Sequence, residues 1–417
     1  MAVIVMNTLT EQQRTQILDK IAAIAEQRLY DPALKDLWRA LVPKWYQNII
    51  KSRDNEVFEQ SVNNLLQQLG VSHVGFFHER KPRAGAKLAI AATFYAYGGD
   101  NGPQWVFQDV HPGGAAHQAG VQPGDFLLQI ADHPVMPPNL PTFALGTDVP
   151  VEIETRAGRR VRAQIRVPHS KTKRRPLVEV QPVSWTKLDE ETGYLKVAMF
   201  PGVIGVDLAR QLDQAVHELA CRRLVIDLRG NSGGGIGSLR LMSYLTPNRV
   251  KVGYSVSRQL LAQDNFDPAT LPCFQRIPHS KGELYLRLPL MAWRARKRSV
   301  LVATEGLGIQ PFQGRVALLI NEHSASSSEM VAAFAAENKL AILVGTKTPG
   351  RLTGASSFPV GYGYRVALPV SAYRTWQGTT VEGQGVTPNM LVPFSVEAIR
   401  QGRDVQLQAA LQAVRSS

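Results

Sequence analysis

The chain has 417 residues, of which 44% are hydrophobic and 19% are charged, and its formal net charge is +13. The length exceeds that of one ordinary domain and the composition is typical of globular proteins, so we expect several folded domains and exclude a disordered chain. The 2 cysteines exclude a disulfide framework. The first residues lack a signal-peptide pattern and no apolar run is long enough to span a bilayer, so we expect a soluble, cytoplasmic protein.

The excess of positive charge gathers in basic clusters at residues 156–162, 171–175 and 294–298. Clusters of this kind can bind nucleic acid or an anionic membrane. These clusters, however, lie in predicted strands and loops, without interleaved aromatic residues and without a nucleic-acid-binding motif. We interpret them as solvated surface and expect no nucleic-acid partner. A scaffold on nucleic acid or membrane is the least favoured function.

Residues 9–70 predict helices. Apolar residues repeat at the helical period between residues 18 and 25, and again between residues 58 and 69. Gly70 follows as the residue type that commonly ends a helix. Ser72 and His73 come soon after it. A single histidine in such a position is ordinarily a surface residue, so the local sequence alone assigns His73 no role.

Short strands and turns follow between residues 87 and 167. A strand at 105–110, a glycine turn, a short helix at 115–119 and a strand at 126–130 succeed one another. This stretch resembles a PDZ domain. The resemblance implies that an extended peptide, in many cases a C-terminus, binds along a sheet edge. It places a carboxylate-binding loop near residues 95–99, with Tyr97, Gly98 and Gly99 as candidate peptide-binding residues; a PDZ fold used only as a spacer or lid is the alternative.

Two predicted strands of the C-terminal half end in small residues suited to catalysis. A buried strand at 224–228 runs into the glycine turn 230–235, and a buried strand at 316–320 runs into serines 324–328 and a helix. In a parallel sheet such strand ends meet at one edge. The glycine turn lacks the ending of a nucleotide-binding loop, so we expect an oxyanion hole instead. The serines have a simpler explanation as helix caps.

The remaining segments carry less information. Residues 250–314 contain several prolines and a basic cluster and predict an insertion or lid over the core. Residues 404–414 predict a last amphipathic helix.

Four motifs of the C-terminal half are 227–234, 324–329, Val344-Gly345 with Thr348 and Gly350, and a closing motif at 381–388. Together, they resemble those of the tail-specific, or C-terminal-processing, serine protease family, with Asn389 in place of the aspartate usual after the closing motif. The resemblance implies an α/β multidomain fold: an N-terminal helical region (1–84), a PDZ-like domain (85–170) and a protease core (171–417) with a mostly parallel, crotonase-like sheet. It implies no cofactor and no metal.

The general base departs from the commonest family pattern. With Ser326 as the nucleophile, the family's lysine position holds Arg351, and a guanidinium does not deprotonate usefully in a protein. The similar tricorn-like branch uses a Ser-His pair and a glutamate, which here correspond to Ser72, His73 and Glu382. Lys347 is the alternative base.

The resemblance therefore implies the following roles. His73 activates Ser326, and Ser72 and Glu382 support His73. The N–H groups of Ser327 and of Gly233 or Gly234 form the oxyanion hole.

We expect a serine endopeptidase that cleaves proteins or peptides through an acyl-enzyme, with the PDZ-like domain recruiting or gating the polypeptide substrate, in particular through its C-terminus. The alternative is a catalytically silent, PDZ-containing peptide-binding or scaffold protein, which the residues Arg351 and Asn389 favour. A homo-oligomer is compatible with the sequence.

Overall fold

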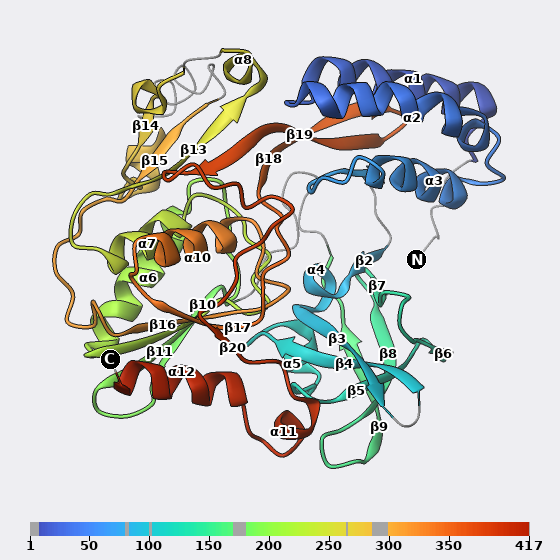
Figure 1. The fold of residues 1–417 in the computed structure, drawn as a ribbon. Helices are drawn as coiled ribbons and strands as arrows, with labels where there is room; N and C mark the ends of the chain where they lie inside the picture. The colour runs from blue at the N-terminus through green and yellow to red at the C-terminus, as the bar shows by residue number, and fades with distance from the viewer. Residues whose placement is uncertain are drawn as a thin grey trace.

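The computed structural model describes residues 8–79, 83–99, 102–169, 181–263, 266–285 and 299–416. Figure 1 shows a group of N-terminal helices, a small β-rich domain and a larger α/β core. The α/β multidomain fold expected from the sequence is confirmed. Among the described residues, no helix is long and apolar enough to cross a membrane.

The N-terminal region consists of α1 (Glu11–Arg28), α2 (Pro32–Ile50) and α3 (Asn55–Gln67). Each helix begins at a polar cap, because the side chains of Thr10, Asp31 and Asp54 accept hydrogen bonds from the first turn. The apolar faces of the helices pack on one another and on a β-hairpin of the core. The chain then turns at Gly70, where φ is +66°, and at His73, where φ is +59°.

The β-rich domain is built on a sheet of order β3-β4-β5-β8-β9, so β3 (Ala92–Gly99) is an edge strand. Residues 95–99 therefore form a strand, and the expectation of a carboxylate-binding loop there is wrong. Pairing of Gly98 with Pro103 and of Gly99 with Gly102 holds these residues in a hairpin. The other elements are β2 (Arg83–Gly85), α4 (Ala86–Ile90), β4 (Gly102–Val110), α5 (Ala115–Gln118), β5 (Phe126–Ile130), β6 (His133–Pro134), β7 (Thr142–Ala144), β8 (Asp148–Glu154) and β9 (Arg160–Arg166).

The core contains a sheet of order β10-β11-β12-β16-β17-β20, in which only the β10–β11 pair is antiparallel. Continuous apolar runs form its central strands because helices cover both faces. Its strands are β10 (Val183–Lys187), β11 (Thr192–Val197), β12 (Arg223–Asp227), β16 (Val316–Ile320), β17 (Ile342–Gly345) and β20 (Met390–Leu391).

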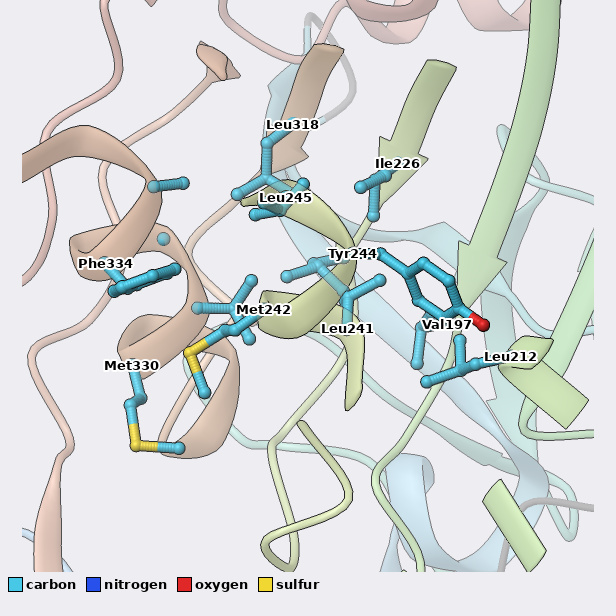
Figure 2. Close-up of a cluster of buried hydrophobic side chains, with 14 of the residues drawn as sticks. Val197, Leu212, Ile226, Leu241, Met242, Tyr244, Leu245, Leu318, Met330 and Phe334 are labelled. Atoms are coloured by element: carbon cyan, nitrogen blue, oxygen red, sulfur yellow. The ribbon is translucent and has the colours of Figure 1, made fainter. Parts of the chain in front are cut away.

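One face of this sheet is covered by α6 (Val206–Leu219), α7 (Ser238–Leu245) and α10 (Ser327–Glu337), and the other by α12 (Val405–Ser416) (Figure 1). Figure 2 shows how the first face is filled: Leu241 and Met242 of α7 lie between the strands and Phe334 of α10. This packing fixes α10, and with it the serine turn from which α10 starts. The predicted last helix corresponds to α12, preceded by the short α11 (Val396–Arg400).

A second sheet, of order β1-β19-β13-β15-β14, runs beside the first and joins distant parts of the chain. β1 (Gly75–His78) pairs with β19 (Tyr364–Thr375), which also pairs with β18 (Thr353–Gly361). The pairing carries residues 72 and 73 to the start of β18. Residues 250–314, which we expected to be an insertion or lid, contribute strands to this sheet. They form β13 (Lys251–Ser257), α8 (Arg258–Leu261), a 3-10 turn (Pro268–Thr270), β14 (Cys273–Phe274) and β15 (Leu301–Ala303).

Candidate active site

The backbone of Ser326 is strained. It lies in the turn between β16 and α10 with φ +56° and ψ −120°, a region that a residue with a Cβ rarely adopts and that commonly marks functional sites. Its N–H donates to the Arg351 carbonyl and to Glu329 Oε2, both at 3.0 Å. A serine on a sharp strand-to-helix turn presents its hydroxyl outward, as nucleophiles of acyl-transfer enzymes do.

The other serines of this turn are structural. Ser324 and Ser328 are fully buried, and their hydroxyls donate to the carbonyls of Leu228 (2.8 Å) and Asn231 (3.0 Å). These bonds tie the serine turn to the glycine turn that follows β12. Ser324 and Ser328 therefore have structural roles. The helix-cap explanation applies to the half-buried Ser326, which is the N-cap of α10 and forms a capping box with Glu329.

Ser72, His73 and Glu382 form a connected chain of hydrogen bonds. Ser72 Oγ lies 2.7 Å from His73 Nδ1 and donates to Glu382 Oε2 at 2.8 Å. Because the Ser72 hydroxyl proton is used toward Glu382, its oxygen must accept from Nδ1–H. This fixes the tautomer of His73 and leaves Nε2 as a proton acceptor.

Glu382 is held from two sides. Its Oε1 accepts the Ser72 N–H at 2.6 Å, and its Oε2 accepts the Leu352 N–H at 2.7 Å.

Desolvation lowers the pKa of His73 below its ordinary value; Glu382 opposes this shift and Arg351 adds to it. The His73 side chain is solvent-accessible, but the surrounding protein still removes much of the water that would stabilise imidazolium. The lowered pKa favours the neutral imidazole, which is the form that can act as a base.

A three-residue segment joins Ser326 to this relay. The carbonyl of Arg351 accepts the Ser326 N–H, and the N–H of Leu352 donates to Glu382. The hydroxyl of Thr353 lies 3.3 Å from His73 Nδ1. Successive residues thus contact the serine turn, the glutamate and the histidine, although the histidine lies more than 250 residues before the other two in the sequence. Ser72, His73 and Glu382 are hydrogen-bonded in one chain, and Ser326 is joined to it through the backbone of residues 351–353. The catalytic roles of the four residues stay predictions.

Glu329 is a site residue to which the sequence reasoning gave no role. Its side chain is fully buried, one turn into α10. Oε1 accepts from Thr348 Oγ1 (2.7 Å) and the Gly350 N–H (2.6 Å), and Oε2 accepts from the N–H groups of Ser326 (3.0 Å) and Arg351 (2.7 Å). Desolvation by burial raises the pKa of Glu329, and these donors oppose the rise. The signal was available: a glutamate three residues after a serine at a helix start is the capping-box spacing.

The candidate oxyanion hole lies where the glycine and serine turns meet. A Cβ on Gly233 would lie 2.6 Å from Ser326 Cβ and 2.9 Å from Ser327 N, so only glycine fits. The Gly233 N–H donates to Asn231 Oδ1 at 2.8 Å. By contrast, the N–H groups of Ser327 and Gly234 donate to no other residue that the structure describes. Ser327 and Gly234 are therefore the better donors for an oxyanion.

Lys347, the alternative base, and Asn389, which replaces the family's aspartate, lie in different surroundings. Lys347 is exposed, whereas its neighbour Thr348 is buried and donates to Glu329. Asn389 accepts the Leu343 N–H at 2.8 Å through Oδ1. An amide oxygen performs this role as a carboxylate would, so Asn389 gives no reason to expect a damaged core.

The β-rich domain touches the turn that leads to Ser326. Asn321 Nδ2 donates to Asp109 Oδ2 at 3.1 Å, and Asn321 Oδ1 accepts the Gly230 N–H at 3.0 Å. His323 Nε2 lies 3.1 Å from the Phe94 carbonyl, which can only accept, so the ring N–H donates. The junction thus links β3 and β4 to both catalytic turns.

The candidate peptide-binding residues lie away from this junction. Tyr97 donates to Glu397 Oε1 of α11 at 2.8 Å. Gly98 and Gly99 end the β3 strand. Peptide binding by these three residues stays a prediction.

The basic cluster at 156–162 is partly compensated by acidic residues. Across the β8–β9 pair, Arg160, Arg162 and Arg166 stand opposite Glu154, Glu152 and Asp148. Cross-strand charge pairs of this kind are ordinary sheet surface. The clusters at 171–175 and 294–298 lie outside the described residues.

Comparisons with known proteins place the chain among peptidases with a PDZ domain. The family model of peptidase family S41 matches residues 191–392, and that of the PDZ domain matches residues 106–139. The carboxyl-terminal-processing protease of Synechocystis sp. is 27% identical over 313 residues, which cover 72% of this chain and 62% of that protein. The carboxy-terminal-processing protease of Bartonella bacilliformis is 24% identical over 237 residues, 56% of this chain and 46% of that protein. The chain thus spans less than two thirds of these relatives.

Solved structures show the same fold. The photosystem II D1 C-terminal processing protease superposes with a TM-score of 0.55 at 17% identity, covering 96% of this chain and 97% of that one. Mature CPAF complexed with lactacystin gives 0.58 at 15% identity, with 98% and 99% covered. The tricorn protease gives 0.52 at 16% identity, with 97% of this chain and 37% of that chain covered.

Proposed function

Because residues 191–392 belong to peptidase family S41 and residues 106–139 to a PDZ domain, we propose that this chain is a serine endopeptidase that forms an acyl-enzyme on Ser326. The observation that carries the proposal is the relay from Glu382 through Ser72 to His73, joined to the strained Ser326 turn by residues 351–353. A structural serine needs no such relay.

The reaction follows from the donors and acceptors of the site. Nε2 of His73 takes the hydroxyl proton of Ser326 as its Oγ attacks the peptide carbonyl carbon. The N–H groups of Ser327 and Gly234 stabilise the oxyanion. The imidazolium then gives its proton to the leaving amine as the C–N bond breaks.

A second half-reaction releases the product. Water attacks the acyl carbonyl carbon while His73 Nε2 takes its proton. The ester C–O bond then breaks, the imidazolium returns that proton to Ser326 Oγ, and the new carboxylic acid is released. Throughout, Ser72 and Glu382 orient the ring and stabilise its positive charge, as the aspartate does in other serine proteases.

The PDZ domain supplies substrate in this proposal. The edge strand β3 offers backbone groups to an extended polypeptide. Several relatives are named for the processing of carboxyl termini, so we propose that this edge receives a C-terminal segment and delivers the chain to Ser326.

Labelling with a fluorophosphonate tests the proposal. The wild type is compared with Ser326→Ala, His73→Ala, Lys347→Ala and, as a matched histidine control, the exposed His133→Ala, and the tagged residue is mapped by mass spectrometry. We expect Ser326 to be tagged and His73→Ala to slow tagging by about 10²–10⁴-fold, with His133→Ala and Lys347→Ala unchanged.

The other outcomes are equally informative. Tagging that survives His73→Ala but requires Lys347 would return the base to a lysine. No tagging of folded wild-type protein would favour the catalytically silent, peptide-binding alternative.

A further inference from the structure

The backbone of Arg351 is fixed between the nucleophile and the acid of the relay. Its carbonyl accepts the Ser326 N–H at 3.0 Å, and its N–H donates to Glu329 at 2.7 Å. The next residue, Leu352, donates to Glu382. These bonds hold the Arg351 backbone between the serine turn and the relay.

The side chain itself is exposed, unlike the backbone that carries it. Within the part of the chain that the structure describes, no carboxylate lies within ion-pair distance of the Arg351 guanidinium. The two acidic groups nearest in the network are committed elsewhere: Glu329 accepts backbone and hydroxyl donors, and Glu382 serves Ser72 and Leu352. Arg351 therefore carries an exposed, permanent positive charge that has no carboxylate partner among the described residues, on a backbone segment bonded to Ser326.

The influence of this cation reaches His73. Arg351 contributes to the lowered pKa of the His73 imidazole. A positive charge near His73 opposes formation of the imidazolium that the reaction requires. A negative group from the substrate, placed on the guanidinium, would remove this opposition. Such a group would improve the chemical step as well as binding.

We propose that Arg351 selects substrates by binding a peptide carboxylate next to the scissile bond, either an aspartate or glutamate side chain or the free C-terminal carboxylate. The inference rests on the proposed function and names its substrate class. Guanidinium and carboxylate match as a planar, two-point pair. The ordinary explanation, a solvated surface arginine, accounts for the exposure but not for a backbone clamped between Ser326 and Glu382.

The test starts from a library of proteome-derived peptides digested with wild-type enzyme, with cleavage sites identified by mass spectrometry. The best substrate is resynthesised with acidic residues changed to their amides, and separately with its C-terminus amidated. These arms distinguish a side-chain carboxylate from a terminal one. The variants are Arg351→Gln, Arg351→Lys and Arg351→Glu, with Lys347→Gln as a matched control that removes an exposed cation from the same loop.

We expect the wild type to cleave the carboxylate form with a kcat/KM about 10- to 100-fold above that of the neutral form, as charge-assisted hydrogen bonds predict. Arg351→Gln should abolish this preference while still cleaving neutral peptides, Arg351→Lys should retain part of it, and Arg351→Glu should reverse it toward basic peptides. Lys347→Gln should keep the wild-type preference.

Two results would overturn the inference. Equal cleavage of carboxylate and neutral peptides by a wild type that labels at Ser326 would refute the role of Arg351 and leave the proposed function standing. A wild type that neither labels nor cleaves any peptide would refute both.

Discussion

At the scale of single residues, the backbone of Ser326 makes a prediction independent of any substrate. Its φ of +56° and ψ of −120° cost a residue with a Cβ about 1–3 kcal/mol. Glycine adopts this conformation freely but loses about 0.5–1 kcal/mol through its greater freedom in the unfolded chain. We therefore expect Ser326→Gly to unfold at higher urea concentration than Ser326→Ala, by about 1 kcal/mol in free energy.

Ser327 provides the control, because it begins the regular helix α10. There, Ser327→Gly should be less stable than Ser327→Ala by about 0.5–1 kcal/mol. If Ala and Gly at position 326 show the same order as at position 327, the turn is not strained.

Individual site residues could be predicted only in part. Ser72, His73 and Glu382 were chosen because they match a family motif; no local pattern connects residues 310 positions apart, as the bond from Ser72 to Glu382 does. The choice between Gly233 and Gly234 required the hydrogen bond from Gly233 to Asn231, which depends on the tertiary fold. Tyr97 was placed in a loop because strand and loop sequences rich in glycine look alike before pairing is known.

At the scale of elements, Glu329 clamps the turn before α10 to the loop between β17 and β18. Glu329→Gln would replace one acceptor oxygen by an NH₂ group that faces N–H donors. We expect a loss of about 1–3 kcal/mol in stability for each donor left unpaired. We also expect a fall of at least about 10-fold in kcat. An NH₂ in place of Oε2 faces the N–H groups of Ser326 and Arg351, and an NH₂ in place of Oε1 releases the loop that carries Arg351.

Two measurements separate these effects. Urea unfolding gives the stability, and peptide hydrolysis far below the midpoint gives kcat of the folded fraction. Glu56→Gln, at an exposed first-turn position of α3, should change neither. An active, fully stable Glu329→Gln enzyme would show that the clamp is dispensable.

A strand could be predicted from the sequence only where its surroundings impose a clear residue pattern. The apolar run at 316–320 predicted β16 with the correct ends, because a strand buried on both faces has a simple signature. The strands β13 and β15 were hidden within residues 250–314, which we read as an insertion or lid. Their partner β19 lies far along the chain, and short antiparallel strands carry little signal of their own.

At the scale of the whole molecule, the PDZ domain and the protease core meet at a buried junction beside the serine turn. Asn321 bridges them: its Nδ2 donates to Asp109 of β4, while its Oδ1 accepts from Gly230 and from His323. Movement of the PDZ domain must therefore disturb the segment leading to Ser326 or break this bridge. No sequence pattern could reveal this hydrogen bond, since Asn321 and Asp109 look like ordinary polar residues.

Asn321→Asp tests the bridge selectively. The substitution keeps the acceptor toward Gly230 and His323 but replaces the amide donor by a carboxylate oxygen facing Asp109. Two buried carboxylates at this distance repel each other, so we expect faster hydrogen exchange in both β4 and the turn at 321–326. We also expect a fall of about 10-fold in kcat/KM, because a small displacement of the nucleophile has a large kinetic cost.

The reciprocal variant decides between a bridge and a general loss of stability. In the double variant Asn321→Asp with Asp109→Asn, the donor and acceptor exchange places and the hydrogen bond can re-form across the junction. Because the contact is pairwise, we expect the double variant to recover slow exchange and most of the activity that the single variant loses. If the two substitutions simply add, or if Asn321→Asp alone leaves exchange and activity unchanged, the junction does not couple the PDZ domain to Ser326.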